Sequence, residues 1–404
     1  MNKKITSLLV VDDDPVFSQL ICQLVQALAG ELPCRVSCAD SAEAAEAEIR
    51  RSQFDLALVD YHMSGLSGLD LLAKVRRLPP EQQPAVIMLT GSGNEAVAVE
   101  AMKLGAKDYL QKTEMDTPLL LRALQSALAQ KRLADQVAAY NAQIKADLEM
   151  AHQLQESLLP QSYPSFPRTA PVQDSALRFY HRYFSTTQLG GDFFSVQNLS
   201  DTVAGVFISD VMGHGVRSAL VTAMLRAMVA DLEMHANDPG RFLSEMNRKL
   251  AAILKQIKEP LYATAFYLVA DVAAGQMRYA KAGHPAPLHL RRQAGIVEPL
   301  PSPTHAGAAL GLFEKAEFIT SQRPLAAGDR IFLFTDGLFE VPNAADEDFG
   351  EARLLEAVRQ RINLPLPELM DGLIADMRAF ADGNDFADDV CLLGMEIART
   401  GCSG

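Results

Sequence analysis

The first third of the chain alternates between short apolar runs and helical patterns, and this alternation restricts its fold more than any other feature of the sequence. Apolar runs predict strands at residues 7–11, 35–38, 56–59, 86–90 and 108–110. Helical patterns lie between and after them, at 16–28, 41–50, 68–76, 94–104 and 117–129. Strands joined by crossover helices run parallel to one another. We therefore predict an α/β domain over residues 1–128, with a doubly wound, five-stranded parallel sheet and helices on both faces.

Charged and hydroxyl residues stand where these predicted strands end. Asp12 and Asp13 close the first strand, Asp60 the third and Thr90 the fourth, and Lys112 lies just past the fifth. The carboxyl ends of parallel strands meet at one edge of the sheet, where folds of this kind place their sites. An Asp after a strand is often only a helix N-cap, but capping does not explain all five residues together.

The chemistry of these residues points to phosphoryl transfer. Carboxylates gathered at one point repel each other unless a cation joins them, and oxygen ligands with an open coordination position suit Mg²⁺. With its charge neutralised by Mg²⁺ and Lys112, Asp60 can act as a nucleophile toward a phosphoryl group and form an acyl phosphate. Thr90 can then hydrogen-bond the new phosphate.

Residues 4–130 resemble the receiver domain of bacterial response regulators. The resemblance rests on four runs, LVVDDD at 9–14, LVDYHM at 58–63, MLTG at 88–91 and DYLQK at 108–112. It implies that the phosphoacceptor is Asp60, which takes phosphate from a histidine kinase or a phosphotransfer protein. The implied Mg²⁺ site consists of Asp13, Asp60 and the His62 carbonyl, with Asp12 assisting. The implied switch residues, which report phosphorylation, are Thr90, Tyr109 and Lys112.

Two residues depart from the usual receiver pattern. Ser64 stands where Pro commonly follows Met, and Thr113 follows Lys112 where Pro is common. Neither departure removes a charged participant. They bear on the geometry of the two loops and on the lifetime of the phosphorylated state.

The pattern of the last receiver helix continues through residues 130–159, without Gly or Pro until Pro160. Apolar residues recur there at close to a 3-4 spacing, interrupted by Asp147, at Val137, Tyr140, Ile144, Ala151, Leu154 and Leu158. This spacing predicts a helical linker over 129–160 that forms a parallel coiled coil and makes the protein a homodimer. The alternative is a single helix packed on its own domain. A segment rich in Pro and Ser, residues 161–172, marks the next domain boundary.

Residues 161–404 show a different rhythm. Predicted strands lie at 177–183, 192–196, 202–209, 261–272, 276–281, 287–290, 329–335 and 389–396. Predicted helices occur in pairs, at 216–232 and 240–256 and again at 351–361 and 366–381. Runs of strands interrupted by paired helices predict two packed antiparallel sheets with helices outside, an α/β/β/α sandwich.

Four separate segments of this half deliver a carboxylate at a strand end, namely Asp192, Asp210, Asp336 and Asp388. The segment around Asp210 is a buried strand followed by a Gly-flanked turn, where backbone carbonyls can approach a cation closely; alone it is equally typical of a structural turn. Charges at an apolar sheet edge are costly unless cations pair them. Oxygen-only ligands indicate Mg²⁺ or Mn²⁺, and two such ions ~4 Å apart can share a bridging hydroxide that attacks phosphorus in line.

Residues 151–399 resemble the metal-dependent protein phosphatase (PPM) family, in the SpoIIE-like branch of bacterial sporulation and stress response. The runs that carry the resemblance are HQLQESLLP at 152–160, GGDFF at 190–194, SDVMGHG at 209–215, AGHP at 282–285, FTDGLFE at 334–340 and DDV at 388–390. The resemblance implies that two Mn²⁺ or Mg²⁺ ions are held by Asp192, Asp210, the Val211 carbonyl, Asp336 and Asp388, the four aspartates being the catalytic residues.

This half also departs from its family. Ser195 stands where another acid is common, and Cys391 replaces the usual Thr. No Arg is placed by a motif to hold the substrate phosphate. His214 and His284 are flanked by turn residues, and for each the choice lies between direct chemistry and a structural hydrogen bond.

Composition excludes several other classes of protein. The net charge of −13 argues against broad binding to nucleic acid or to an anionic membrane. Five scattered cysteines argue against a disulfide framework and a zinc site, and they fit a reducing compartment. The apolar run at 5–11 is too short for a signal peptide, and no run approaches the ~18 apolar residues of a membrane span. We expect a cytoplasmic protein.

These features together predict a two-component response regulator whose output is a phosphoserine/phosphothreonine protein phosphatase, with regulation through Asp60. The resemblance implies a phosphorylated anti-sigma-factor antagonist as substrate, in a partner-switching pathway. The rival hypothesis is a catalytically silent adaptor whose receiver controls a docking surface. A small-molecule phosphatase is a third hypothesis, which differs only in substrate.

Overall fold

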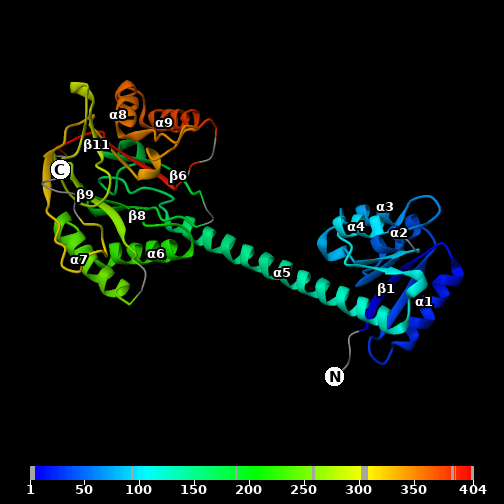
Figure 1. Ribbon diagram of the computed structural model, residues 1–404. Coiled ribbons are helices and arrows are strands. Elements are labelled where there is room, and N and C mark those ends of the chain that lie inside the picture. Colours follow the sequence, from blue (N-terminus) through cyan, green and yellow to red (C-terminus); the bar gives the residue numbers. More distant parts are fainter. Residues whose placement is uncertain are drawn as a thin grey trace. The chain divides into compact units, whose positions relative to one another are not determined.

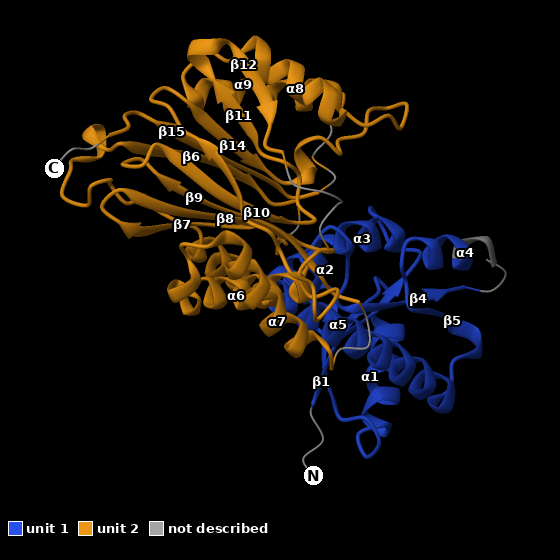
Figure 2. Cartoon of the chain, turned by 90° about the vertical axis from the view of Figure 1, so that its left-hand side faces the viewer, with its two compact units in different colours: residues 1–145 blue, residues 146–404 orange. Residues whose placement is uncertain are grey.

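The computed structural model describes residues 5–91, 95–186, 189–256, 260–301, 308–383, 386 and 388–401, with the backbone alone for 95–97. The chain divides into two compact units, Met1–Lys145 and Ala146–Gly404 (Figure 2). Within the described ranges, every helix is too short or too polar to cross a bilayer.

The first unit contains the predicted parallel sheet, which includes β1 (Figure 1). Its strands follow the order β2-β1-β3-β4-β5. Its strands are β1 (Thr6–Val11), β2 (Cys34–Ala39), β3 (Leu56–Asp60), β4 (Ala85–Thr90) and β5 (Asp108–Gln111). All four strand pairs are parallel. The order is that of a doubly wound sheet with a switch point beside β1 and β3, so the prediction for this fold is confirmed.

Helices cover both faces of this sheet: α1 (Pro15–Ala27), α2 (Ala42–Arg51), α3 (Gly68–Val75), α4 (Glu95–Lys103) and the first turns of α5 (Thr117–Leu158). Three of them begin at side-chain caps, which satisfy free backbone N–H groups; Asp14 caps α1, Ser41 caps α2 and Ser67 caps α3. Two hydrophobic clusters fill the space on either face of the sheet. Alternate residues of β1 divide between them, Leu8 and Val10 on one face and Leu9 and Val11 on the other.

The helix α5 has 42 residues and continues past the receiver core. Leu120, Leu124 and Leu128 are buried in that core. Six large apolar residues further along α5 are exposed, namely Leu133, Val137, Tyr140, Ile144, Met150 and Leu154. The helix predicted over 129–160 is therefore present and ends at Leu158, within the second unit.

The second unit contains two five-stranded antiparallel sheets. One has the order β13-β10-β9-β8-β7 and the other β12-β11-β14-β15-β6. Their strands are β6 (Leu177–Phe184), β7 (Phe193–Ser200), β8 (Val203–Val211), β9 (Ala263–Asp271), β10 (Gln276–Ala282), β11 (Leu288–Arg291), β12 (Ile296–Pro299), β13 (Ser321–Pro324), β14 (Arg330–Phe334) and β15 (Val390–Ile397). Two of these strands, β12 and β13, were not predicted from the sequence; each is a four-residue strand at the edge of its sheet.

Three hydrophobic clusters define the layers of this unit. The central cluster lies between the two sheets and includes Phe194, Ile208 and Leu393. A second joins the β7–β8–β9 side to α6 (Val216–Asp231) and α7 (Pro239–Leu254). The third joins the other sheet to α8 (Gly350–Gln360) and α9 (Leu366–Phe380). These clusters confirm the predicted α/β/β/α sandwich.

Candidate functional site

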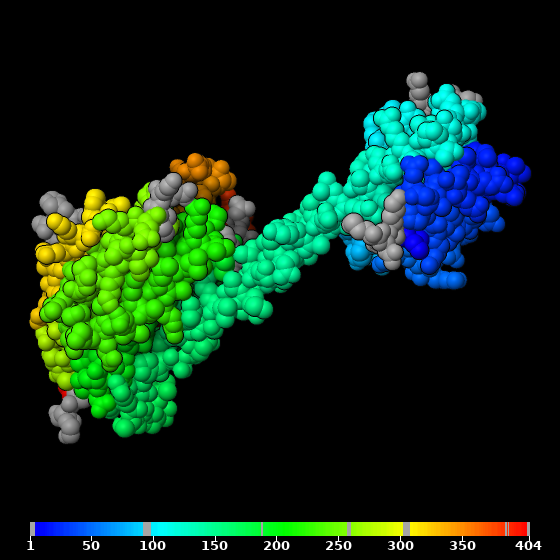
Figure 3. Space-filling model, turned by 90° about the horizontal axis from the view of Figure 1, so that it is seen from below, coloured from blue at the N-terminus to red at the C-terminus, as the bar shows by residue number. Residues whose placement is uncertain are grey.

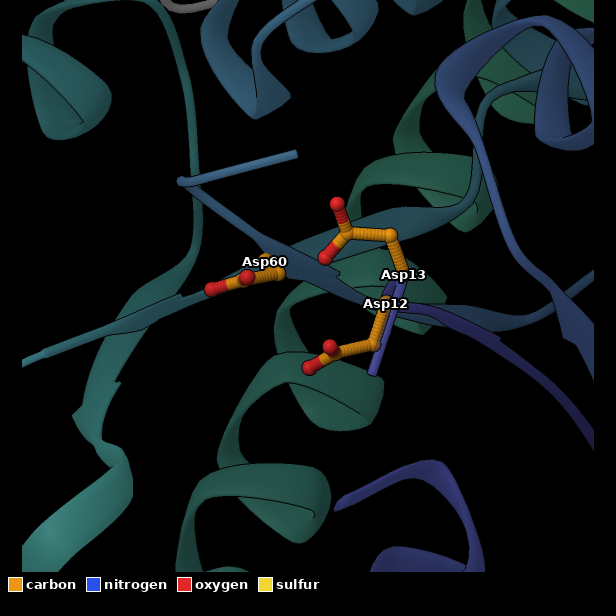
Figure 4. A group of neighbouring side chains, drawn as sticks. All are labelled: Asp12, Asp13 and Asp60. Atoms are coloured by element: carbon orange, nitrogen blue, oxygen red, sulfur yellow. The ribbon is translucent and has the colours of Figure 1, made fainter. Parts of the chain in front are cut away.

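The receiver carboxylates meet at the carboxyl ends of β1 and β3. One ligand oxygen from each of Asp12, Asp13 and Asp60 lies within 4.8 Å of the other two, and Figure 4 shows the three side chains grouped around one point. The Lys112 Nζ atom lies 2.7 Å from Asp12 Oδ2 and 2.9 Å from Asp60 Oδ2. Asp12 and Asp60 are almost fully buried. An oxygen-only donor set of this kind fits a hard divalent cation such as Mg²⁺.

Electrostatics at this site follow from burial and from Lys112. Burial raises the pKa of Asp60, the Lys112 ammonium opposes the rise, and Asp12 adds to it. Burial also disfavours the charge of Lys112, but hydrogen bonds to Asp12 and Asp60 outweigh it and raise the pKa of Lys112. The lysine therefore stays charged and offsets part of the repulsion between the two buried carboxylates.

Ser64, the residue that departs from the usual receiver pattern, contacts the metal-site carboxylates directly. Its backbone N–H and its hydroxyl both donate to Asp13 Oδ2, at 2.8 and 2.7 Å. These two hydrogen bonds lower the pKa of Asp13. A Pro at position 64 could supply neither donor. One carboxylate oxygen of Asp13 is thus engaged by Ser64, which sequence reasoning did not predict.

The predicted switch residues occupy different environments. Thr90 is buried at the end of β4, and Tyr109 is 42% exposed in β5. His62 follows Tyr61 beyond β3 and makes a backbone hydrogen bond to Asp60, which helps to lower the pKa of that carboxyl. The roles of Thr90, Tyr109 and the His62 carbonyl stay predictions.

Four strand ends of the second unit deliver the other predicted carboxylates. Asp192 directly precedes β7, and Asp210 is the next-to-last residue of β8. Asp336 comes two residues after the end of β14, and Asp388 comes two residues before β15. Phe193 pairs with Ser209 across β7 and β8, which brings Asp192 beside Asp210. Phe334 pairs with Leu392 across β14 and β15, which brings the other two segments together.

The loop after Asp210 is fixed by backbone geometry that only glycine allows. Gly213 and Gly215 have φ of 80° and 92°, in the region that other residues avoid. A Cβ on Gly191 would lie 2.6 Å from the Val211 carbonyl oxygen and 3.2 Å from Asp210 Oδ1. The absence of a side chain at Gly191 therefore leaves a space lined by these two oxygens. The Val211 N–H donates to Gly191 O at 3.2 Å and holds the two segments together.

The buried carboxylates repel one another. Burial raises the pKa of Asp192 well above its usual range, and Asp210, Asp389 and Asp336 add to the rise. Burial and the charges of Asp336 and Asp388 raise the pKa of Asp210 to about 7. Burial and Asp388 also raise the pKa of Asp336. Such a set of charges is unstable at neutral pH without protons or cations.

The donor chemistry of this site fits divalent cations. Its available ligands are carboxylate oxygens and the Val211 carbonyl, without a neighbouring thiol or imidazole in the predicted set. Among the residues that the structure describes, the only group of three carboxylates within 4.8 Å is the one in the receiver.

Thr335 positions the most buried of these carboxylates, a role that sequence reasoning missed. Its hydroxyl donates to Asp192 Oδ2 at 2.7 Å and accepts the Cys391 N–H at 3.0 Å. Thr335 is fully buried. The residue stands inside the FTDG run, so the motif marked the position but not its partner.

The two adjacent aspartates before β15 perform different tasks. Asp389 Oδ1 accepts hydrogen bonds from Ser185 Oγ, Thr186 N and Thr186 Oγ1, and Asp389 Oδ2 accepts the Gly191 N–H at 2.7 Å. Asp389 is therefore occupied by the loop that carries Asp192. Asp388 is exposed, and its charge acts on Asp210 and Asp336. This geometry is consistent with Asp388 as the ligand of the pair.

The two flagged histidines differ in burial. His214 is exposed in the loop after Asp210. His284 is 1% exposed, and its Nδ1 atom lies 2.8 Å from Thr264 Oγ1. Thr264 pairs with Asp210 across β8 and β9. His284 thus supports the strand opposite Asp210, and the geometry favours a structural role.

The end of α5 contacts the same metal-site loop. Gln155 Nε2 donates to Gly190 O at 2.7 Å, and Gln155 Oε1 accepts the Gly190 N–H at 3.0 Å. Arg226 of α6 donates to the Leu158 carbonyl. Gln155 is buried although the residues on either side of it are exposed. Both backbone groups of Gly190 are therefore held by one helix side chain.

We predict opposite effects for Asp388→Asn and Asp389→Asn. Asn at 389 keeps one acceptor oxygen and loses the other, so the Gly191 N–H or the Ser185 and Thr186 donors lose their partner, at a cost of about 1–3 kcal/mol in stability. Asn at 388 relieves repulsion and leaves the metal-free fold at least as stable, but weakens Mn²⁺ binding by at least about tenfold. Thermal unfolding with chelator and Mn²⁺ titration calorimetry measure the two effects; similar unfolding temperatures would contradict the division of tasks.

We also predict a pH dependence of stability that depends on His284. Burial, with a smaller effect of Lys281, lowers the pKa of His284 from 6.5 to about 3. Between these values the unfolded chain binds a proton at His284 that the folded chain does not. The contribution of neutral His284 to the free energy of unfolding is therefore complete above pH 6.5 and is lost as the pH falls. From pH 6.5 to 5, wild type should lose about 2 kcal/mol relative to His284→Gln. Urea denaturation at both pH values tests this, and parallel losses would contradict it.

Comparisons with known families agree with both halves of this description. Residues 8–125 match the family model of the response regulator receiver domain, and residues 200–398 match that of stage II sporulation protein E (SpoIIE). The SiaA-PP2C domain of Pseudomonas aeruginosa covers 64% of this chain and 99% of its own, with a TM-score of 0.54 and 23% identity. This last likeness concerns the fold.

Two curated relatives match the chain over different lengths. Phosphoserine phosphatase RsbP of Bacillus subtilis is 26% identical over 255 residues, which are 63% of this chain and 58% of that protein. Transcriptional regulatory protein ZraR of Salmonella typhimurium is 36% identical over 125 residues, which are 31% of this chain and 27% of that protein. The chain thus spans less than two thirds of the length of either relative. The match to the receiver model over residues 8–125 and the match to the SpoIIE model over residues 200–398 agree with the motifs of the two halves.

Proposed function

We propose that this chain is a two-component response regulator whose output is a metal-dependent phosphoserine/phosphothreonine protein phosphatase. The observation that carries the proposal is that Asp192, Asp210, Asp336 and Asp388 form a group whose charges act on one another, with Asp210 Oδ1 and the Val211 carbonyl beside Gly191. All four aspartates of the family motif are present. Two residues outside the set, Thr335 and Asp389, orient it through hydrogen bonds to Asp192 and Gly191. The likeness to a phosphoserine phosphatase over 255 residues supports the same reaction.

In this proposal the two cations, Mn²⁺ or Mg²⁺, are held by Asp192, Asp210, the Val211 carbonyl, Asp336 and Asp388. When bound, they activate water at neutral pH and offset the charge of the phosphoryl group. The protein's own part is to hold the ligands in place. Thr335 fixes the rotamer of Asp192, Asp389 fixes the loop before it, and the Gly213 and Gly215 conformations turn the Val211 carbonyl toward the site.

The receiver controls this activity through Asp60. A histidine kinase or phosphotransfer protein phosphorylates Asp60, with Mg²⁺ held by Asp13, Asp60 and the His62 carbonyl and with Asp12 assisting. Lys112, already within 2.9 Å of Asp60 Oδ2, would pair with the new phosphate. Thr90 and Tyr109 respond to it.

The signal reaches the phosphatase through α5. This helix begins in the receiver core and ends at Leu158, three residues past the side chain that holds Gly190. A change in the rotation or register of α5 would move Gln155, and Gly190 with it. Gly190 is two residues from Asp192, so the motion acts on a metal ligand directly.

We propose that α5 also pairs two copies of the chain. Leu133, Val137, Tyr140 and Ile144 follow a 4-3-4 spacing and are 44–71% exposed. Figure 3 shows this part of α5, in cyan to green, at the surface. A regular stripe of large exposed apolar residues is typical of a coiled-coil seam. A parallel homodimer would cover it and would let the two helices change register together.

The substrate that fits this arrangement is a phosphorylated anti-sigma-factor antagonist, whose dephosphorylation would change its choice of partner. A catalytically silent adaptor is the alternative; it gains no support from the site, because an adaptor does not need buried carboxylates that destabilise one another. A small-molecule phosphatase would use the same residues and differs only in what it accepts.

The direct test is hydrolysis by the purified chain. With excess Mn²⁺ we expect release of phosphate from a phosphoserine protein substrate, and Asp210→Asn should lower kcat by at least about 10²-fold, as loss of a transition-state contact does. Ser195→Ala, outside the proposed ligand set, is the matched control and should retain activity. Equal signalling by wild type and Asp210→Asn in cells would favour the adaptor hypothesis. Hydrolysis of p-nitrophenyl phosphate without hydrolysis of any phosphoprotein would favour a small-molecule phosphatase.

Matched helix variants test the route of control. Ile144→Glu places a charge in the proposed seam and should convert a dimer to a monomer in light scattering. Gln155→Leu should leave the dimer intact but remove the response of phosphatase activity to beryllofluoride, because Gly190 loses both hydrogen bonds to the Gln155 amide. Lys145→Glu, beside the seam, is the control for charge. A monomeric wild type, or a beryllofluoride response that survives Gln155→Leu, would contradict this route.

A further inference from the structure

Two cysteine thiols of the receiver, which no role described above includes, lie against each other. Cys22 is on α1 and Cys38 is on β2, and their Sγ atoms are 3.6 Å apart. They are sixteen residues apart in the sequence, so the contact depends on the fold. A disulfide requires about 2.05 Å between sulfurs, and small side-chain rotations could close the remaining gap.

Both thiols are accessible to a small solute. Cys22 is half-buried and Cys38 is exposed. They line a groove of about 850 Å³ together with Asp12, Asp13, Asp40 and Glu48. Four carboxylates around the groove repel anionic reagents. An oxidant that reaches the pair should therefore be small and uncharged, which favours a hydroperoxide over an anionic disulfide such as oxidised glutathione.

We propose that Cys22 and Cys38 form a redox-active dithiol, which a neutral hydroperoxide converts to a reversible disulfide between α1 and β2. The link lies beside the metal-site carboxylates, because Cys38 pairs with Val10 of β1, two residues before Asp12. The Asp12 N–H donates to Ala39 O, the neighbour of Cys38, at 3.1 Å. The disulfide fixes the helix that begins directly after Asp12–Asp14 to the strand that holds Asp12 in place.

The chemistry balances with one equivalent of hydrogen peroxide. The thiolate of one cysteine attacks a peroxide oxygen, the O–O bond breaks, and the released hydroxide takes up a proton to become water. The product is a sulfenic acid. The second thiol then attacks its sulfur, the S–O bond breaks, and a second water leaves with the thiol proton. Two thiols are oxidised by two electrons in total, and one peroxide is reduced to two waters.

The environment also sets the speed of this reaction. Burial, and the hydrogen bond with Cys22, raise the pKa of Cys38 to about 11. The thiolate is therefore a small fraction of Cys38 at neutral pH, and oxidation should be slower than at a dedicated peroxide sensor. A reversible disulfide of this kind is compatible with a reducing compartment, where such bonds are transient and regulatory.

Peptide mapping of the full chain tests the assignment. Reduced protein is treated with millimolar hydrogen peroxide, alkylated and digested with trypsin without reductant. The expected product joins the peptide 5–35 to the peptide 36–50 and disappears after dithiothreitol. Because 5–35 contains both Cys22 and Cys34, Cys34→Ser is the matched control. The linked peptides should persist in Cys34→Ser and be absent from Cys22→Ser and from Cys38→Ser.

Hydrogen exchange provides the structural readout. Oxidation should slow amide exchange in α1, residues 15–27, in wild type and in Cys34→Ser but not in Cys22→Ser. Oxidised glutathione at the same concentration should react more slowly than peroxide. The proposal is overturned if no linked peptide forms, if the link requires Cys34 or joins two chains, or if α1 exchanges equally fast with and without the link.

Discussion

The repulsion between buried carboxylates is the constraint on which both sites of this chain depend. Strand ends bring together three aspartates of the receiver and four of the second unit. All of these except Asp13 and Asp388 are buried or half-buried, where water screens their charges poorly. A fold gains nothing in stability from this arrangement. The rest of each unit must therefore supply enough packing to hold the carboxylates together until cations bind.

The two sites respond to this constraint differently. In the receiver, Lys112 reaches Asp12 and Asp60 within 2.9 Å and supplies a permanent positive charge. In the second unit the described contacts of Asp192 and Asp210 are with a hydroxyl, with backbone groups and with other acids. The raised pKa values of that site are the direct consequence. A site with an internal lysine offsets part of the repulsion by itself, whereas a site without one needs protons or cations to offset it.

Most strands, and the aspartates at their ends, could be predicted from the sequence because the patterns that mark them are local. Strand runs that end in Asp12, Asp60 or Asp210 combine a periodic pattern with a polar stop, and both lie within a few residues. The edge strands β12 and β13 lacked such signals, because each has four residues and ends in Pro. Their pairing is set by β11 and β10, which a single segment cannot reveal.

The contacts that orient the site could not be predicted, because they join distant segments. Ser64 reaches Asp13 across 51 residues, Thr335 reaches Asp192 across 143, and Asp389 reaches Gly191 across 198. Sequence motifs marked some of these positions, but a motif gives a residue's place in the chain and not its partner. From the sequence, Ser64 was only a departure from Pro. The structure shows that its backbone N–H and its hydroxyl both donate to Asp13.

Gln155 shows why α5 belongs to the second unit as much as to the first. Most residues of α5 between Leu133 and Leu154 face solvent and could vary without effect on either core. Gln155 is an exception, since its amide makes both hydrogen bonds that the Gly190 backbone can offer. An amide that satisfies an N–H and a C=O at once must keep one orientation, because rotating it by half a turn places donor against donor. The loop that carries Asp192 is therefore sensitive to the rotation of α5 and not only to its presence.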